Sequence, residues 1–129
     1  MTDKKFKYFK LSEFDSPDQP GSGAQNMDLD FIALLDEARH IANIPFKITS
    51  GWRSPEHNIA LAKRGYKVAK NSAHLKGLAA DISVRTSRAR YLILDALFTV
   101  GFRRFGIGKG FIHVDADDTK TPNLIWHYY

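Results

Sequence analysis

Residues 72–81 read Ser-Ala-His-Leu-Lys-Gly-Leu-Ala-Ala-Asp and place a histidine, a glycine and an aspartate at fixed spacing. Asp81 opens an apolar run that continues to Val84, which is typical of a β-strand. Gly77 lies between His74 and Asp81 and allows the chain a tight path between them. We therefore expect the loop histidine to fold back beside the aspartate at the start of a strand.

A second compact motif, Phe-Ile-His-Val-Asp, follows at residues 111–115. Alternate side chains of a β-strand point to the same face. We therefore expect His113 and Asp115 to face one cleft, while Ile112 and Val114 face the core.

These motifs together offer the ligands of a catalytic metal site. Two histidines and one carboxylate can fill three corners of a zinc tetrahedron and leave the fourth corner for water. Either His113 or Asp115 can complete the set begun by His74 and Asp81, and we favour His113 because neutral imidazole suits zinc well. Asp115 would then act as the general base or orient His113 through a hydrogen bond.

Length and composition indicate one soluble domain over residues 1–129. A chain of 129 residues suits a single core, and 43% hydrophobic with 26% charged residues is ordinary for a globular protein. No apolar run approaches the roughly 18 residues of a membrane span, so none is expected. The basic start lacks the apolar run of a signal peptide, which predicts synthesis in the cytoplasm without export by the general secretory route.

Cysteine content and charge narrow the chemistry and the partners. Because the chain has no cysteine, disulfides, thiolate metal ligands and a cysteine nucleophile are excluded. The net charge of +5 either serves surface solubility or favours polyanionic partners such as nucleic acid, anionic lipid or bacterial wall polymers. Lys and Arg are scattered and form no block interleaved with aromatic residues, so nucleic acid is not an expected partner.

The pattern along the chain mixes helices and strands without a regular β-α-β alternation. It predicts the α+β class, with a small antiparallel sheet packed against helices. The expected helices are 27–42 with Asn26 or Asp28 as its cap, 55–64 with Ser54 as its cap, and a third that Thr86 or Ser87 caps and Gly101 stops. The expected strands are 46–50, 79–84, 104–107, 111–114 and a last one within the aromatic tail 122–129. The remaining segments are a short strand or an extended opening at 6–14, in which Ser12 could start a helical turn, a loop at 15–23 and a polar loop at 66–77.

These motifs, in this order, resemble the zinc D-alanyl-D-alanine carboxypeptidase family of peptidoglycan metallopeptidases, which shares its core with the amino-terminal signalling domain of hedgehog proteins. The similarity covers almost the whole chain and extends to small phage-type members. The block from Ser72 to Asp81 is its specific part, and the shorter motifs are weak alone. The matching residues are Ser50-Gly51-Trp52-Arg53-Ser54 with Asn58, Ser72, His74, Gly77, Ala79, Asp81, His113 and Asp115.

The resemblance implies a role for each matching polar residue. His74, Asp81 and His113 would bind one zinc ion. Arg53 would hold a substrate carboxylate or steady the developing oxyanion, and Ser72 would hydrogen-bond near the ligands or the substrate. The implied reaction is hydrolysis of an amide in peptidoglycan stem peptides or cross-links, in the manner of a D-Ala-D-Ala carboxypeptidase or an endopeptidase.

One position departs from the family pattern. Many members carry an acidic general base three residues before the last histidine ligand, where this chain has Gly110. Asp115 is the nearest replacement. His127 is a rival for the third ligand or a hydrogen-bond donor to the transition state and substrate. Asp117 and Asp118 are expected to be solvated loop charges.

These features predict a monomeric phage or prophage enzyme of the endolysin kind. It would reach the bacterial cell wall after release from the cytoplasm, during lysis or as part of a virion. The alternative is a module of the same fold that binds metal or the wall without catalysis, for example in a virion tail tip. The missing acid at residue 110 is the main argument for that alternative.

Overall fold

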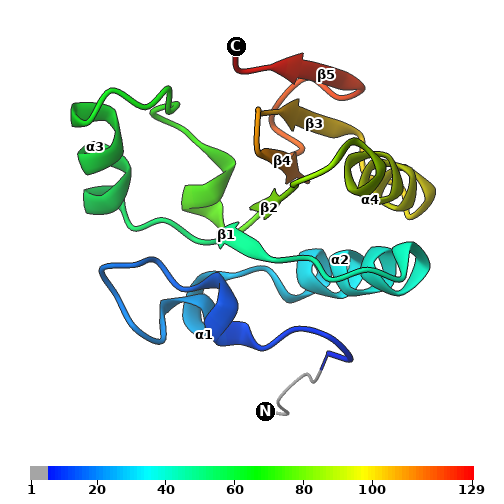
Figure 1. Cartoon of the computed structure of the whole chain (residues 1–129). Coiled ribbons are helices and arrows are strands. Elements are labelled where there is room, and N and C mark those ends of the chain that lie inside the picture. The colour runs from blue at the N-terminus through cyan, green and yellow to red at the C-terminus, as the bar shows by residue number, and fades with distance from the viewer. Residues whose placement is uncertain (1–5) are drawn as a thin grey trace.

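The computed structural model describes residues 6–129, which fold around one five-stranded sheet (Figure 1). The strand order is β1-β2-β4-β3-β5. The strands are β1 (Ile48–Ser50), β2 (Ala79–Ser83), β3 (Arg104–Ile107), β4 (Phe111–Asp115) and β5 (Leu124–His127). The α-helices are α1 (Ser22–Asn26), α2 (Leu29–Ala42), α3 (Pro55–Lys63) and α4 (Ser87–Thr99), and two 3₁₀ helices are η1 (Leu11–Phe14) and η2 (Ala73–Lys76).

The α+β class is confirmed, but the sheet is mixed and not wholly antiparallel. β1, β2, β4 and β3 pair antiparallel, whereas β5 pairs parallel with β3. The loop after β4 carries the chain back to the start of β3, so that Leu124 pairs with Arg104. The expected tail strand therefore exists, and the direction of its pairing depends on this return path.

The three main helices begin where the sequence predicts, and each first turn is capped by a side chain. Asp28, Ser54 and Thr86 accept hydrogen bonds from backbone N–H groups three residues further on. Pro55 occupies the first position of α3, where its missing N–H leaves no hydrogen bond unmade. Among residues 6–129, none of these helices has the length and hydropathy needed to cross a bilayer.

Three short segments differ from the prediction because side chains satisfy their backbone. In the opening segment, the Asp36 carboxylate accepts from the N–H groups of Lys7 and Tyr8, so no strand forms there, and η1 is the helical turn considered at Ser12. The expected loop at 15–23 ends in α1, whose start is held by Asp15. The polar loop at 66–77 contains η2.

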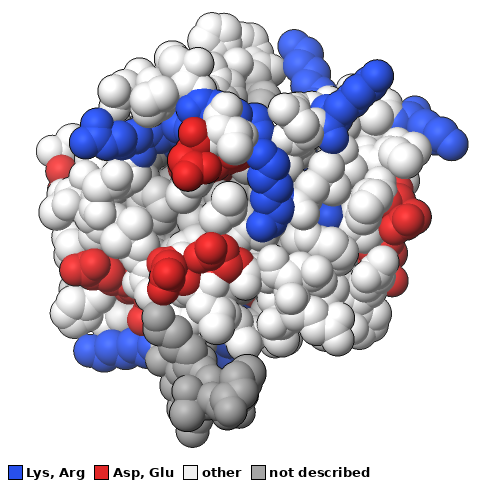
Figure 2. All heavy atoms as spheres, turned by 180° about the vertical axis from the view of Figure 1, so that it is seen from behind, with Lys and Arg blue, Asp and Glu red and all other residues white. Residues whose placement is uncertain are grey.

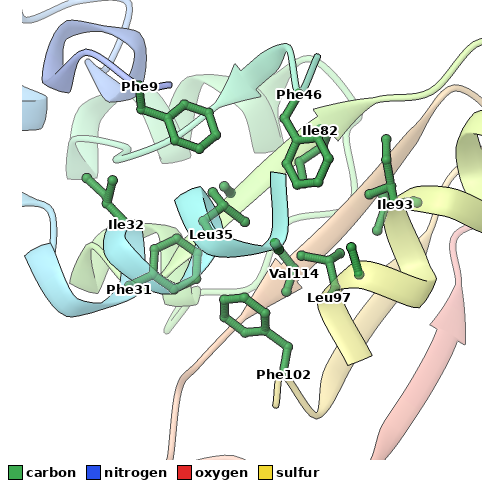
Figure 3. Packing of buried hydrophobic residues seen from close by; sticks show 14 of the residues in the cluster. Phe9, Phe31, Ile32, Leu35, Phe46, Ile82, Ile93, Leu97, Phe102 and Val114 are labelled. Atoms are coloured by element: carbon green, nitrogen blue, oxygen red, sulfur yellow. The ribbon is translucent and has the colours of Figure 1, made fainter. Parts of the chain in front are cut away.

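The core fills the space between one face of the sheet and helices α2 and α4, which pack against each other (Figure 3). Ile112 and Val114 of β4 are fully buried there, as the alternation predicts. The opposite face of β4 carries His113 and Asp115, which lie away from this core. One face of the sheet therefore stabilises the fold, and the other is free to build a site.

Candidate metal centre

Three side chains bring one ligand atom each to a single point on the second face of the sheet. His74 Nε2 lies 3.2 Å from both His113 Nδ1 and Asp81 Oδ1, and His113 Nδ1 lies 3.0 Å from Asp81 Oδ1. A zinc tetrahedron with bonds of about 2.0–2.1 Å has edges of about 3.3–3.4 Å. The spacing and the nitrogen and oxygen donors therefore fit one zinc ion with a fourth position left over.

Sheet register and a short helix place these ligands. β2 and β4 pair so that Asp81 lies opposite His113. η2 carries His74, and the Ser72 hydroxyl caps this helix by accepting from the His74 backbone N–H at 3.2 Å. Ser72 thus acts near the ligands by fixing the backbone of one of them.

Gly77 ends η2 in a conformation and at a position that exclude a side chain. Its φ is +73°, and an added Cβ would lie 2.0 Å from the backbone oxygen of Asn26. The chain reverses here with α1 packed directly against it, which brings β2 back beside His74. The tight path expected from the sequence is therefore present, and a backbone contact explains why only glycine fits.

The Ser50–Ser54 segment orients His74 and Asp81. The Gly51 carbonyl lies 2.7 Å from His74 Nδ1. A carbonyl can only accept, so Nδ1 carries the proton and Nε2 is free to bind a metal. Arg53 donates from Nη2 to Asp81 Oδ2 at 3.4 Å and from Nε to the Ser50 hydroxyl at 3.1 Å. Arg53 therefore faces the site and contacts the ligand oxygen that points away from the cluster.

Asp115 contacts His113 on the side away from the cluster. Its Oδ2 lies 2.7 Å from His113 Nε2, and its Oδ1 accepts from Arg104 Nε at 2.7 Å and from the Asp117 backbone N–H at 3.2 Å. A carboxylate on the Nε2 side directs Nδ1 toward Asp81. Of the two roles predicted for Asp115, this geometry favours orienting His113 over acting as the general base.

Protonation follows the same contacts in the metal-free protein. Burial lowers the pKa of His113, but its hydrogen bonds to Asp115 and Asp81 outweigh burial and raise that pKa to about 9. Burial also lowers the pKa of His74, and here the Asp81 charge does not compensate. For Asp81, the opposing effect of burial is outweighed by His74 and His113, which hold the carboxyl pKa well below its usual range. Asp81 is thus ionised, as a metal ligand must be.

The ligands lie in a cleft of about 1010 Å³. Alternation along β5 and the residue after it turns Trp126 and Tyr128 into this cleft, whereas His127 is exposed and packs its ring against Tyr129. The structure therefore does not bring His127 to the site. Beyond the ligands, the lining comprises Thr49, Ser50, Arg53, His57, Leu61, 65–69, Ser72, Ala73, Arg104, Phe111, Asp115, Lys120, Trp126 and Tyr128.

Two residues near the end of β4, Asp117 and Arg104, differ from what the sequence led us to expect. Asp117 is buried and accepts from Lys76, Lys120 and Thr119, so it is no solvated charge, although Asp118 is exposed. Arg104, which sequence reasoning missed, is the partner of Asp115. Alternation along 104–107 would place it on the site face, but its partner follows only from strand register.

The hairpin turn holds Gly110, where the resemblance led us to look for an acid. An added Cβ there would have no atom within 4 Å. Glycine at this position is thus not required by packing, and the turn supplies no carboxylate.

Comparison with known proteins identifies one family. The model of the family described as peptidoglycan L,D-endopeptidase MepK, an M15-type peptidase family, matches residues 1–121. A search among curated proteins gave no significant match. The match covers His74, Asp81 and His113 and ends before β5 begins.

Proposed function

The chain belongs to the family of peptidoglycan L,D-endopeptidase MepK, and we propose that it is a zinc-dependent hydrolase of an amide bond in peptidoglycan stem peptides or cross-links. The observation that carries the proposal is the cluster of His74, Asp81 and His113, with ligand atoms 3.0–3.2 Å apart inside a large cleft. Three protein ligands with one open position are the arrangement of catalytic zinc sites, whereas structural sites are closed by four.

Different residues around the metal would bind it, orient its ligands and contact the substrate. Zinc would supply a Lewis acid that activates water and polarises the scissile carbonyl. The Gly51 carbonyl and the Asp115 carboxylate fix the rings of His74 and His113, so that the ligand set is preorganised. Arg53 lines the cleft beside Asp81 and can donate to a substrate carboxylate or to the oxygen on which negative charge develops.

We further propose that the bond cut is internal and joins an L-configured to a D-configured centre. The family description supports this choice. The cleft supports it too, because its lining continues beyond the ligands to α3 and residues 65–69 in one direction and to β5 in the other. A peptide can therefore extend on both sides of the metal, which a carboxypeptidase that removes one terminal D-alanine does not need.

One observation favours a second function, a metal-containing module that binds the wall without cutting it. The cleft lining contains two carboxylates, Asp81 and Asp115, among the described residues, and both oxygens of each already have partners. No carboxylate of the lining is therefore free to take a proton from water, as a general base must.

The place of action is part of the proposal. The enzyme would act at the bacterial cell wall after release from the producing cell, in phage lysis or as a virion component. A net charge of +5 favours approach to anionic wall polymers, and on the face in Figure 2 basic side chains are interspersed with acidic ones. Finding the chain in lysates but never in purified virions would favour lysis.

The test is mass spectrometry of muropeptides after incubation with the protein, with chelator, and with zinc restored. His74→Ala removes a ligand, and His127→Ala is the matched control on an exposed histidine. Zinc-dependent products from the wild type and His127→Ala alone would support the enzyme, and product masses identify the bond. Loss of one terminal residue would indicate a carboxypeptidase. One bound zinc per chain without any product would favour the binding module.

A further inference from the structure

β5 and the residue that follows it add an aromatic wall to the cleft, formed by Trp126 and Tyr128. Both line the cleft that contains the metal ligands. They lie beyond residue 121, where the match to the family ends. The family relationship therefore does not explain these two side chains, and their role must be derived from their contacts.

Gly106 of β3 provides the space in which the wall lies. Gly106 pairs with His113 on one side and with Trp126 on the other. A Cβ at Gly106 would lie 2.6 Å from the Tyr128 ring, 2.7 Å from Trp126 Nε1 and 2.8 Å from the Tyr128 hydroxyl. Any other residue at this position would displace the Trp126 N–H and the Tyr128 hydroxyl. The position of the wall therefore depends on the glycine in β3.

Neighbouring side chains fix the two rings beside the metal ligands. The Trp126 ring lies 5.6 Å from the His113 ring, and the Arg104 guanidinium lies 4.9 Å from its centre, within range of a cation–π interaction. The Tyr128 ring packs 5.3 Å from Phe111, between centroids. The wall is thus attached to the same strands that carry the ligand His113 and its partner Asp115.

The Tyr128 hydroxyl is placed to donate a hydrogen bond into the cleft. The Tyr128 hydroxyl and Trp126 Nε1 both lie over Gly106, and because an indole N–H can only donate, it can contact the hydroxyl only through the tyrosine oxygen. The hydroxyl proton then remains available. Burial raises the pKa of Tyr128, so the group stays protonated at neutral pH.

We propose that Trp126 and Tyr128 are substrate-contacting residues, with the wall packing against the stem peptide and the Tyr128 hydroxyl donating to one of its carbonyl or carboxylate oxygens. Peptide ligands present such oxygens along their whole length, and a fixed ring with one polar tip contacts them at little cost in side-chain entropy. This inference rests on the proposed function, because it takes the stem peptide as the ligand.

The test compares Tyr128→Phe with Tyr129→Phe. Both remove one hydroxyl, but Tyr129 is exposed and does not line the cleft. Calorimetry would measure binding of a peptidoglycan tetrapeptide stem to the metal-free protein, which avoids turnover. Loss of one hydrogen bond should weaken binding by about 3- to 10-fold in Tyr128→Phe, with zinc stoichiometry and melting temperature unchanged, whereas Tyr129→Phe should bind as the wild type.

Kinetics with zinc on the same stem peptide and on its cross-linked dimer separate failure of this inference from failure of the proposed function. If the wild type binds the peptide more tightly than Tyr128→Phe does but cuts neither the peptide nor its dimer, the wall assignment stands and the enzyme proposal fails. If the wild type cuts it while Tyr128→Phe matches the wild type in affinity, KM and kcat, the enzyme proposal stands and the wall assignment is overturned. Absence of any peptide binding by the wild type also overturns the wall assignment.

Discussion

Replacing Asp115 with asparagine should damage zinc binding more than it damages the zinc-loaded enzyme. Oδ1 of Asp115 accepts from two donors, Arg104 Nε and the Asp117 N–H, while Oδ2 faces His113 Nε2 at 2.7 Å. The asparagine oxygen should keep the place of Oδ1, which turns the amide NH2 toward Nε2. An NH2 group can only donate. His113 would therefore accept at Nε2 and carry its proton on Nδ1, the atom that faces Asp81.

The expected loss of zinc affinity can be estimated from this change of the His113 tautomer. Removing a hydrogen-bond partner of a metal-bound histidine typically costs 10- to 100-fold in metal affinity, or about 1.4–2.7 kcal/mol. Asp115→Asn should lie toward the upper end, because it stabilises the tautomer that cannot bind. Competition with a chromophoric chelator measures the zinc affinity. Asp118→Asn is the matched control, since Asp118 is exposed three residues along the same loop.

Activity at increasing zinc concentration then distinguishes the two roles of Asp115. If Asp115 orients His113, hydrolysis should recover substantially once zinc exceeds the weakened dissociation constant. If Asp115 is the general base, zinc affinity should match the control while turnover stays lost at every zinc concentration. The second result would refute the reasoning from the Nε2 contact.

Three further predictions test the ligands, the turn and the titration of the site. His74→Ala should abolish stoichiometric zinc binding while His127→Ala retains it, as measured by metal analysis after dialysis; full zinc in the former contradicts the ligand set. Gly77→Ala should cost at least about 2 kcal/mol of unfolding free energy, because of its positive φ and the contact with α1, whereas Gly110→Ala should stay within about 0.5 kcal/mol by urea denaturation. In the metal-free protein, the raised pKa of His113 stabilises the fold fully below about pH 6.5, the unfolded value, and this contribution is lost as pH rises to about 9. Urea midpoints with chelator should therefore fall across that window, and a flat profile would show that His113 is neutral.

Periodicity and capping residues predicted most of the fold. Helices α2, α3 and α4 and four of the strands follow from apolar spacing with Asp28, Ser54 and Thr86 as caps, all of which are local signals. α1 was not predicted, because its start is held by Asp15, a loop residue outside the helix. The parallel pairing of β5 was not predicted either, because it depends on the path by which the loop after β4 returns to the start of β3.

The sequence likewise predicted those features of the site that depend on one strand, and not those that depend on the pairing of two strands. Alternation correctly put His113 and Asp115 on one face, since that pattern lies within a single strand. The Arg104–Asp115 contact depends on register between β3 and β4, which the sequence does not display. Alternation along the tail predicts that Trp126 and Tyr128 share one face and that His127 lies on the other. Which of these faces lines the cleft depends on the pairing of β5 with β3, which the sequence does not display.

The charges around His113 would favour an anionic peptide at the site. Each carboxylate uses one oxygen toward the metal cluster or its histidine and the other toward an arginine: Asp81 with Arg53, and Asp115 with Arg104. The two arginines neutralise the two carboxylates, so a bound zinc ion would leave the centre net positive. Such a centre stabilises negative charge that develops on a carbonyl oxygen. It would also attract the carboxylates of a stem peptide, and on the proposed function the arginine pairs would then serve substrate recognition as well as ligand orientation.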